Sequence, residues 1–122
     1  MNRPHTITIY NSYKDKYIKH ILKDVYWYGT DSINISGKGV VESNSINIII
    51  DTKDNLDKYI SKESYQGNEN TYTLDTGIRI VYGEGPDIKS LNELENYKQI
   101  SILSYDVNIV DSPVDNILIL GR

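Results

Sequence analysis

The stretch Ile46-Asn-Ile-Ile-Ile50 decides the fold that we expect for this chain. Ile46, Ile48 and Ile50 share one parity, so their side chains point to the same face of an extended strand. Ile49 adds an apolar side chain near the end of the opposite face, and a strand that is apolar on both faces is central and well buried. The chain is therefore expected to fold around a β-sheet.

Similar alternation recurs on both sides of this stretch. Thr6–Tyr10 predicts a first strand that ends in a turn at Asn11-Ser12. Tyr17–Tyr28 predicts a long strand in which Lys23-Asp24 is the expected place for a bulge, with one parity shared by Ile21, Val25 and Trp27. Three further strands are expected at Thr73–Tyr82, Ile100–Ile109 and Asn116–Leu120.

One segment has a clear helical pattern. Ser90-Leu-Asn-Glu93 has the form of a capping box, and apolar residues recur at helical spacing from Ile88 to Leu94. The pattern predicts a short helix of about two turns near residues 88–98. Short strands separated by turns, with one small helix and long loops, predict a mainly β fold, a small β-barrel or sandwich formed by residues 1–122 as a single domain.

Two connections are long. Gly29–Ser45 is rich in Gly, Ser and Asn, which predicts a small hairpin or flap. Asp51–Thr71 shows no sustained period, and a loop of that length in a compact domain is usually functional or mobile.

The composition of the 122 residues excludes several classes of function. Cysteine is absent, which removes disulfides, thiolate metal sites and cysteine nucleophiles. Thirteen basic against 17 acidic residues give a net charge of −4, without a basic cluster for tight nucleic-acid binding. No signal peptide and no apolar run of bilayer length is evident, so a soluble protein is expected. Eleven tyrosines and no phenylalanine favour sheet over helix.

Candidate chemical groups are few. His5 and His20 lack neighbours at metal-ligand or triad spacing, so both are expected on the surface or on a strand face. Asp51, Asp54 and Asp57 lack the glycine and terminal glutamate of a calcium loop and predict a solvated turn. We therefore expect no catalytic residue, metal or cofactor, and no enzyme activity.

Two glycine pairs and one aromatic triplet also allow a structural and a functional interpretation. Gly37-Lys-Gly39 and Gly83-Glu-Gly85 do not open helices, which favours hairpin turns over phosphate loops. Tyr26-Trp-Tyr28 could stack on a base or a partner. The favoured interpretation is that Trp27 fills the core while its two neighbours cover the outer face.

Four segments resemble small structural proteins of tailed phages, encoded beside portal and head-tail joining genes. They are Thr6–Asn11, Gly37–Val41 with the strand that follows it, Gly77–Glu84 and Ile100–Gly121. The chain departs from such proteins at Asp51, where they often carry proline, and at Asp115-Asn116, where they often carry His-Trp.

The resemblance implies a neck component, a head-completion or stopper-like β-barrel. Such a protein forms a homo-oligomeric, hexameric ring below the portal and its adaptor, closes the channel, lets DNA pass without specific binding and offers a platform to the tail. The implied location is the virion, after assembly in the host cytoplasm, with no membrane contact. A similar neck role exists in phage-tail-like bacteriocins.

Two other classes stay open: a tail terminator or collar subunit, and a small bacterial β-barrel binding module or enzyme with a deep pocket. For a ring, the two long connections are the candidates for intersubunit contact or channel closure. Their candidate residues are Gly29, Asp31, Gly37, Lys38, Gly39, Tyr59, Lys62, Tyr65 and Asn68.

Overall fold

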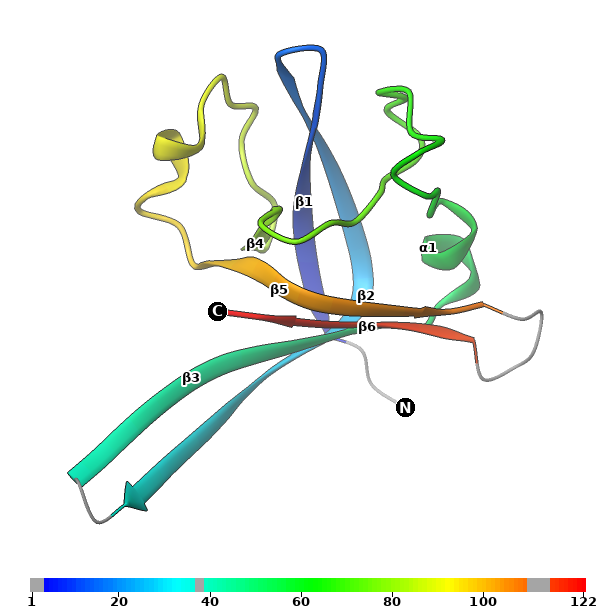
Figure 1. Ribbon diagram of the computed structural model, residues 1–122. Coiled ribbons are helices and arrows are strands. Elements are labelled where there is room, and N and C mark those ends of the chain that lie inside the picture. Colours follow the sequence, from blue (N-terminus) through cyan, green and yellow to red (C-terminus); the bar gives the residue numbers. More distant parts are fainter. Residues whose placement is uncertain (1–3, 37–38, 110–114) are drawn as a thin grey trace.

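The computed structural model describes residues 4–36, 39–109 and 115–122, and for residues 30–44 the backbone alone. It shows the predicted barrel, a closed sheet of six antiparallel strands in the order β1-β2-β3-β6-β5-β4 (Figure 1). The strands are β1 (His5–Tyr13), β2 (Lys16–Ser36), β3 (Gly39–Ile50), β4 (Arg79–Tyr82), β5 (Gln99–Asn108) and β6 (Asn116–Gly121). Two short helical elements, α1 (Lys53–Asp57) and η1 (Leu91–Leu94), lie in the connections.

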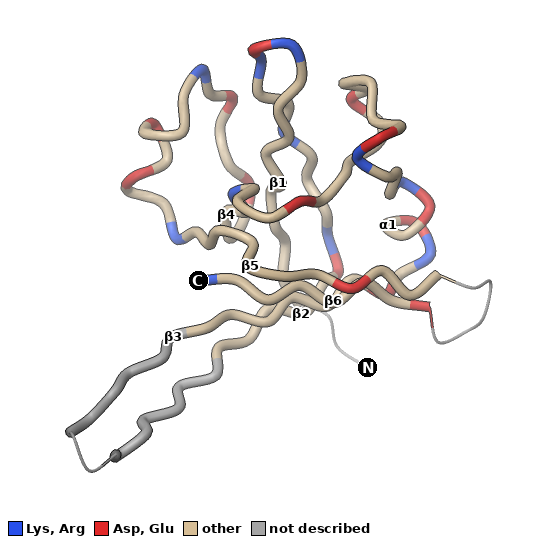
Figure 2. Tube along the Cα trace, viewed as in Figure 1, with Lys and Arg blue, Asp and Glu red and all other residues tan. Residues whose placement is uncertain are grey.

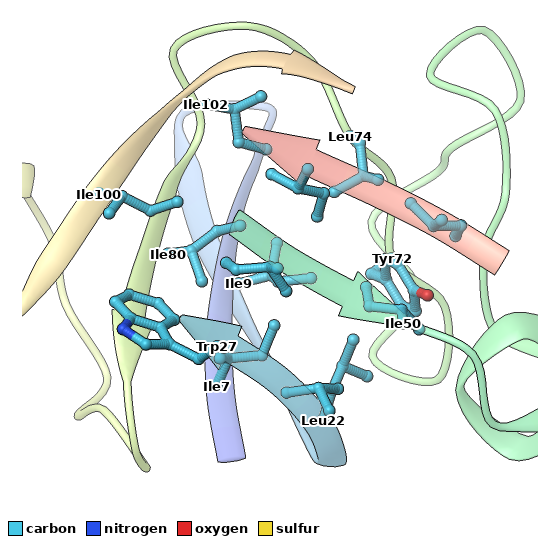
Figure 3. Close-up of a cluster of buried hydrophobic side chains, with 14 of the residues drawn as sticks. Ile7, Ile9, Leu22, Trp27, Ile50, Tyr72, Leu74, Ile80, Ile100 and Ile102 are labelled. Atoms are coloured by element: carbon cyan, nitrogen blue, oxygen red, sulfur yellow. The ribbon is translucent and has the colours of Figure 1, made fainter. Parts of the chain in front are cut away.

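The core consists mainly of isoleucine, because alternate residues of every strand point into the barrel (Figure 3). Ile48 and Ile50 are fully buried, as their shared parity predicts. Trp27 is 7% exposed within this core whereas Tyr28 is 48% exposed, which confirms the structural interpretation of the aromatic triplet. The remaining strands contribute Ile7, Ile9, Leu22, Val25, Ile80, Ile100, Ile102, Ile117 and Ile119.

A bulge in β2 corrects one predicted core residue. His5 pairs with Val25 but Ile7 pairs with Leu22, so β2 carries one extra residue there. Asp24 occupies this bulge with a φ of 62°. The extra residue changes the parity of the strand, so Leu22 lies in the core and Ile21 is only half-buried outside it. The bulge was predicted, but its effect on Ile21 was not.

The first hairpin turns later than predicted. β1 continues through Asn11 to Tyr13, and the turn is Lys14-Asp15, whose φ angles of 48° and 63° are those of a tight primed hairpin turn. Asn11 is 1% exposed. Its Nδ2 donates to the Thr73 carbonyl at 2.9 Å, and its Oδ1 accepts from the Thr73 backbone N–H at 3.0 Å. Asn11 thus takes the place of a partner strand at the end of the barrel.

Replacing Asn11 with alanine is expected to lower the free energy of unfolding by about 2 to 4 kcal/mol, because the buried N–H and C=O of Thr73 both lose their partner. The measurement is urea unfolding. Asn108 is exposed and its Nδ2 donates to the Asn116 side chain, so Asn108→Ala is the matched control and should change stability by less than about 0.5 kcal/mol. Equal losses in the two variants would contradict the role given to Asn11.

The segment from residue 51 to residue 78 packs on the barrel instead of forming an open loop. Leu56 in α1 and Tyr65 are both 8% exposed, and Tyr59 forms an isolated parallel bridge with Tyr72. The predicted strand at residues 73–82 is therefore shortened to β4. The strand is shorter because the Asn11 side chain accepts the hydrogen bond of the Thr73 backbone N–H, and because Gly77 turns the chain with a φ of 87°.

The connection between β4 and β5 covers the outer face of β1 and β4. Its predicted helix is a 3₁₀ helix of four residues, and the Glu93 carboxylate accepts from the Ser90 N–H at 2.8 Å, as the capping box predicts. Tyr10 and Val81 pack outside the barrel with residues of this connection in a second small core that also contains Ile88 and Leu94. This outer face is therefore occupied by the protein's own chain.

Candidate interaction surface

The outer face of β2, β3 and β6 carries two cross-strand rows of side chains. The row between them, formed by Trp27, Ile48 and Ile119, is buried, so the residues on either side of it point outward. The register places Tyr26, Ile49 and Leu118 in one outward row, and Tyr28, Asn47 and Leu120 in the other. We call these six residues the outer face.

The outer face and the strand segments that form it contain no charged residue. Residues 25–29, 45–50 and 116–121 have no Lys, Arg, Asp or Glu. Figure 2 shows most charged residues elsewhere, in the β1–β2 turn, around α1 and in the connection that contains η1, although Asp106 of β5 lies beside Leu118. A surface patch whose centre has few charged residues and several aromatic and aliphatic side chains is typical of protein–protein interfaces.

Two side chains of the outer face are largely accessible. Tyr28 is 48% exposed and Leu118 is 39% exposed, while Tyr26, Ile49 and Leu120 are half-buried. Burying one large apolar side chain completely is worth about 1.5 to 3 kcal/mol. Since half or less of each side chain is still exposed, Tyr28 and Leu118 can each contribute about 1 kcal/mol to association with another surface.

The β2–β3 hairpin adds free backbone edges beside the outer face. Residues 39–45 of β3 pair with β2 alone, because β6 pairs with β3 only from Ile46 to Ile50. Residues 29–36 of β2 likewise pair only with β3. This two-stranded ribbon leaves the barrel wall (Figure 1). An isolated pair of strands is marginal in stability, and its unpaired edges can accept a further strand.

A comparison with known families bears on the whole chain. A family described as a family of unknown function, DUF6751, matches residues 3–122. The chain belongs to DUF6751. No curated protein and no solved structure matches it.

The predicted flap residues of this DUF6751 protein lie on the ribbon. Gly29 pairs with Ile46, Asp31 pairs with Asn44, and Gly39 begins β3. Gly37 and Lys38 lie outside the described residues. The predicted hairpin is therefore present, and it is an extension of two barrel strands.

The predicted loop residues lie at the other end of the molecule, so the structure does not bring the two groups together (Figure 1). Tyr59 and Tyr65 pack against the protein's own chain, Tyr59 at the bridge to Tyr72. Lys62 lies 3.5 Å from Asp75, and Asn68 Oδ1 accepts from the backbone N–H of Asn70 at 2.8 Å. Lys62 and Asn68 are the exposed members of this group.

Sequence reasoning did not identify the outer face. Its apolar residues each resemble ordinary strand residues, and only the register shows that Ile49 lies between Tyr26 and Leu118. A usable signal is the apolar outward residue in each of three strands, combined with the absence of charge. It becomes visible only when the pairing β2-β3-β6 is known.

The described residues hold no group of three His, Asp or Glu side chains that could bind a metal. Asp54 and Asp57 lie in α1 and not in the predicted turn, and Lys53 Nζ lies 2.9 Å from Asp57. None of the described helices is long and apolar enough to cross a bilayer.

His20 is buried beside two tyrosines. Its Nε2 lies 3.1 Å from the Tyr65 hydroxyl, and its ring contacts the rings of Tyr65 and Tyr72. Burial lowers the pKa of His20, and a hydrogen bond to the Glu69 backbone and the nearby Glu69 charge oppose this shift only in part. Burial also raises the pKa of Tyr65 to about 12, so its hydroxyl stays protonated near neutral pH.

The lowered pKa of His20 predicts acid sensitivity. Below the ordinary pKa of 6.5 the unfolded chain binds a proton that the folded chain does not, so stability falls as the pH drops through 6.5 toward the folded pKa. Urea midpoints at pH 7.5 and pH 5 should differ more in the natural protein than in His20→Gln. The carboxylates that titrate in this range are the same in both proteins and affect both equally. If the two proteins showed the same change in urea midpoint, His20 would not be neutral in the folded state.

Proposed function

We propose that this DUF6751 protein is a structural subunit of a phage neck, a head-tail connector of the stopper type that forms a homo-oligomeric, six-fold ring. The observation that carries the proposal is the uncharged outer face of β2, β3 and β6, next to a ribbon with unpaired edges. Both features can form contacts between protein subunits, and neither has polar side chains arranged to bind or act on a small substrate.

The distribution of these surfaces supports a ring. The six strands close into a barrel that leaves only short stretches of strand unpaired in its wall, so subunits meet chiefly through faces and projecting elements. The outer face lies on one wall, and the ribbon reaches beyond it. Contact between two different surfaces of identical subunits is heterologous, and it closes into a ring when the rotation between neighbours divides a full turn.

The segments that resemble phage neck proteins are mostly strands of the barrel. Thr6–Asn11 belongs to β1, Gly77–Glu84 contains β4, and Ile100–Gly121 contains β5 and β6. The resemblance therefore concerns the barrel wall, which supports the same architecture for this protein. A net charge of −4 suits a channel through which DNA passes without binding.

The test is electron microscopy of phage particles from a host that carries the gene and from one in which it is deleted. We expect a labelled copy of the protein at the neck. The deletion should give heads that lose their DNA and do not join tails. Full heads beside tails of abnormal length would instead indicate a tail terminator, and normal particles would refute a neck role.

A further inference from the structure

The barrel wall has an opening beside the end of β1. β1 continues to Tyr13, but β4 begins at Arg79, which pairs with Tyr10. Among the described residues, Asn11, Ser12 and Tyr13 therefore have a partner strand on the β2 side only. The residues that precede Arg79 leave β1 and lie next to β5, where the Gly77 N–H donates to the Ile102 carbonyl at 2.8 Å.

The free backbone groups at this opening belong to Ser12. The Thr6 carbonyl accepts from the Gly83 N–H at 2.7 Å, so the even-numbered residues of β1 direct their backbone polar groups toward the β4 side. Thr8 and Tyr10 meet β4 there, and Ser12 lies past its end. Ser12 is exposed, so its N–H and C=O are accessible to an incoming strand.

A groove of about 520 Å³ runs along this free edge. Tyr13 and Tyr17 contribute aromatic walls, and Lys62 and Arg79 contribute cations. Thr73 also lines the groove, but its side chain is buried. The groove is therefore a cleft with aromatic and cationic walls beside a free strand edge.

The charges of the groove favour an acidic ligand. Lys62 lies 3.5 Å from Asp75, so this pair is largely neutral. Arg79 Nη1 donates to the Gln99 side chain at 3.1 Å, and no carboxylate pairs with Arg79 among the described residues. A half-buried guanidinium without a counterion, on a protein with net charge −4, is suited to bind a carboxylate.

We propose that this groove binds an extended, acidic segment of a partner protein as an additional strand on β1. The segment pairs with the N–H and C=O of Ser12, and one of its carboxylates meets Arg79. Side chains on one face of the segment pack on Tyr17, and those on its other face pack on Tyr13. This inference is independent of the neck proposal, because it needs only the open edge and the unpaired guanidinium.

The test uses the capped peptide acetyl-Val-Thr-Val-Glu-Val-Thr-amide and a twin with Lys in place of Glu, titrated into the ¹⁵N-labelled full chain. The expected result is a shift of the Ser12 amide signal and about ten-fold tighter binding of the Glu peptide. Arg79→Gln should remove the difference between the two peptides. No shift at millimolar peptide, or shifts far from the groove, would overturn the proposal.

Two variants of Ser12 separate strand pairing from side-chain contact. Ser12→Pro removes the free N–H, and because that N–H points away from β2 the variant loses no hydrogen bond inside the barrel. Ser12→Ala keeps the N–H. Binding should weaken about ten-fold in the first and stay unchanged in the second, at equal melting temperatures. Equal weakening in both, tighter binding of single-stranded oligothymidine, or occupation of the groove by a second copy without peptide would refute the proposal.

Discussion

Gly121→Val is expected to remove more than about 3 kcal/mol of stability, a large part of the total for a domain of this size. Gly121 is buried at the end of β6, where it pairs with Ile46 of β3 and Ile102 of β5. A Cβ atom on Gly121 would lie 2.3 Å from Ile100 Cδ1 and 2.8 Å from the Ser101 carbonyl oxygen. The isoleucine can rotate, but the carbonyl belongs to the backbone, and Ser101 exchanges two hydrogen bonds with Arg122. β5 and β6 must therefore move apart at Gly121 to accept the larger side chain.

A matched glycine lies in the same cross-strand row. Gly29 pairs with Ile46, which pairs with Gly121, and a Cβ atom on Gly29 would meet Ile46 Cδ1 at an ordinary 3.5 Å. Gly29→Ala should change stability by less than about 1 kcal/mol, whereas Gly121→Ala should cost about 2 kcal/mol. Thermal and urea unfolding give both values. A Gly121→Val protein as stable as the natural one would show that the barrel is not closed tightly there.

Alternation along the chain was enough to predict a mainly β fold, a barrel or a sandwich, and the structure shows the barrel. The parity of Ile48 and Ile50 depends on the period of a single strand, and each strand must bury one face wherever it pairs. The capping box at Ser90 and Glu93 was predictable for the same reason, since its two residues lie three apart. Local patterns of this kind do not depend on which strands become neighbours.

Features that depend on distant contacts could not be predicted. Asn11 and Ser12 are typical turn residues, yet Asn11 is held in the strand by Thr73, 62 residues away. Ile21 and Leu22 are both apolar, and only the bulge at Asp24 decides which of them enters the core. The local sequence permits both outcomes at each position, and tertiary packing selects one.

The candidate surface follows the same rule. The Gly29–Ser45 flap was predictable as a hairpin from its turn residues, and its backbone forms the ribbon. The outer face was not predictable, because Tyr26 and Leu118 are 92 residues apart and join one row only through Ile49 of β3. Contact surfaces built across several strands are properties of the register, which no single segment of the sequence specifies.

Leu118→Lys is expected to prevent assembly without harming the barrel. Leu118 is 39% exposed and lies opposite Ile49 on one side and Asp106 on the other. A lysine at this position can extend its stem along Ile49 and place its ammonium near Asp106, so the free subunit should lose less than about 1 kcal/mol. In an assembled ring this lysine and the neighbouring Asp106 would both be withdrawn from water among apolar side chains, at a cost of at least about 2 kcal/mol.

The measurement is the amount of the variant in purified particles, by mass spectrometry, when it replaces the natural protein in the producing cell. A cost of that size corresponds to a decrease of about thirty-fold or more. Tyr97→Lys is the control, because Tyr97 is 42% exposed in the connection that contains η1, away from the outer face, and it should enter particles normally. If Leu118→Lys entered particles as well as Tyr97→Lys, the outer face of β2, β3 and β6 would not be the contact between subunits.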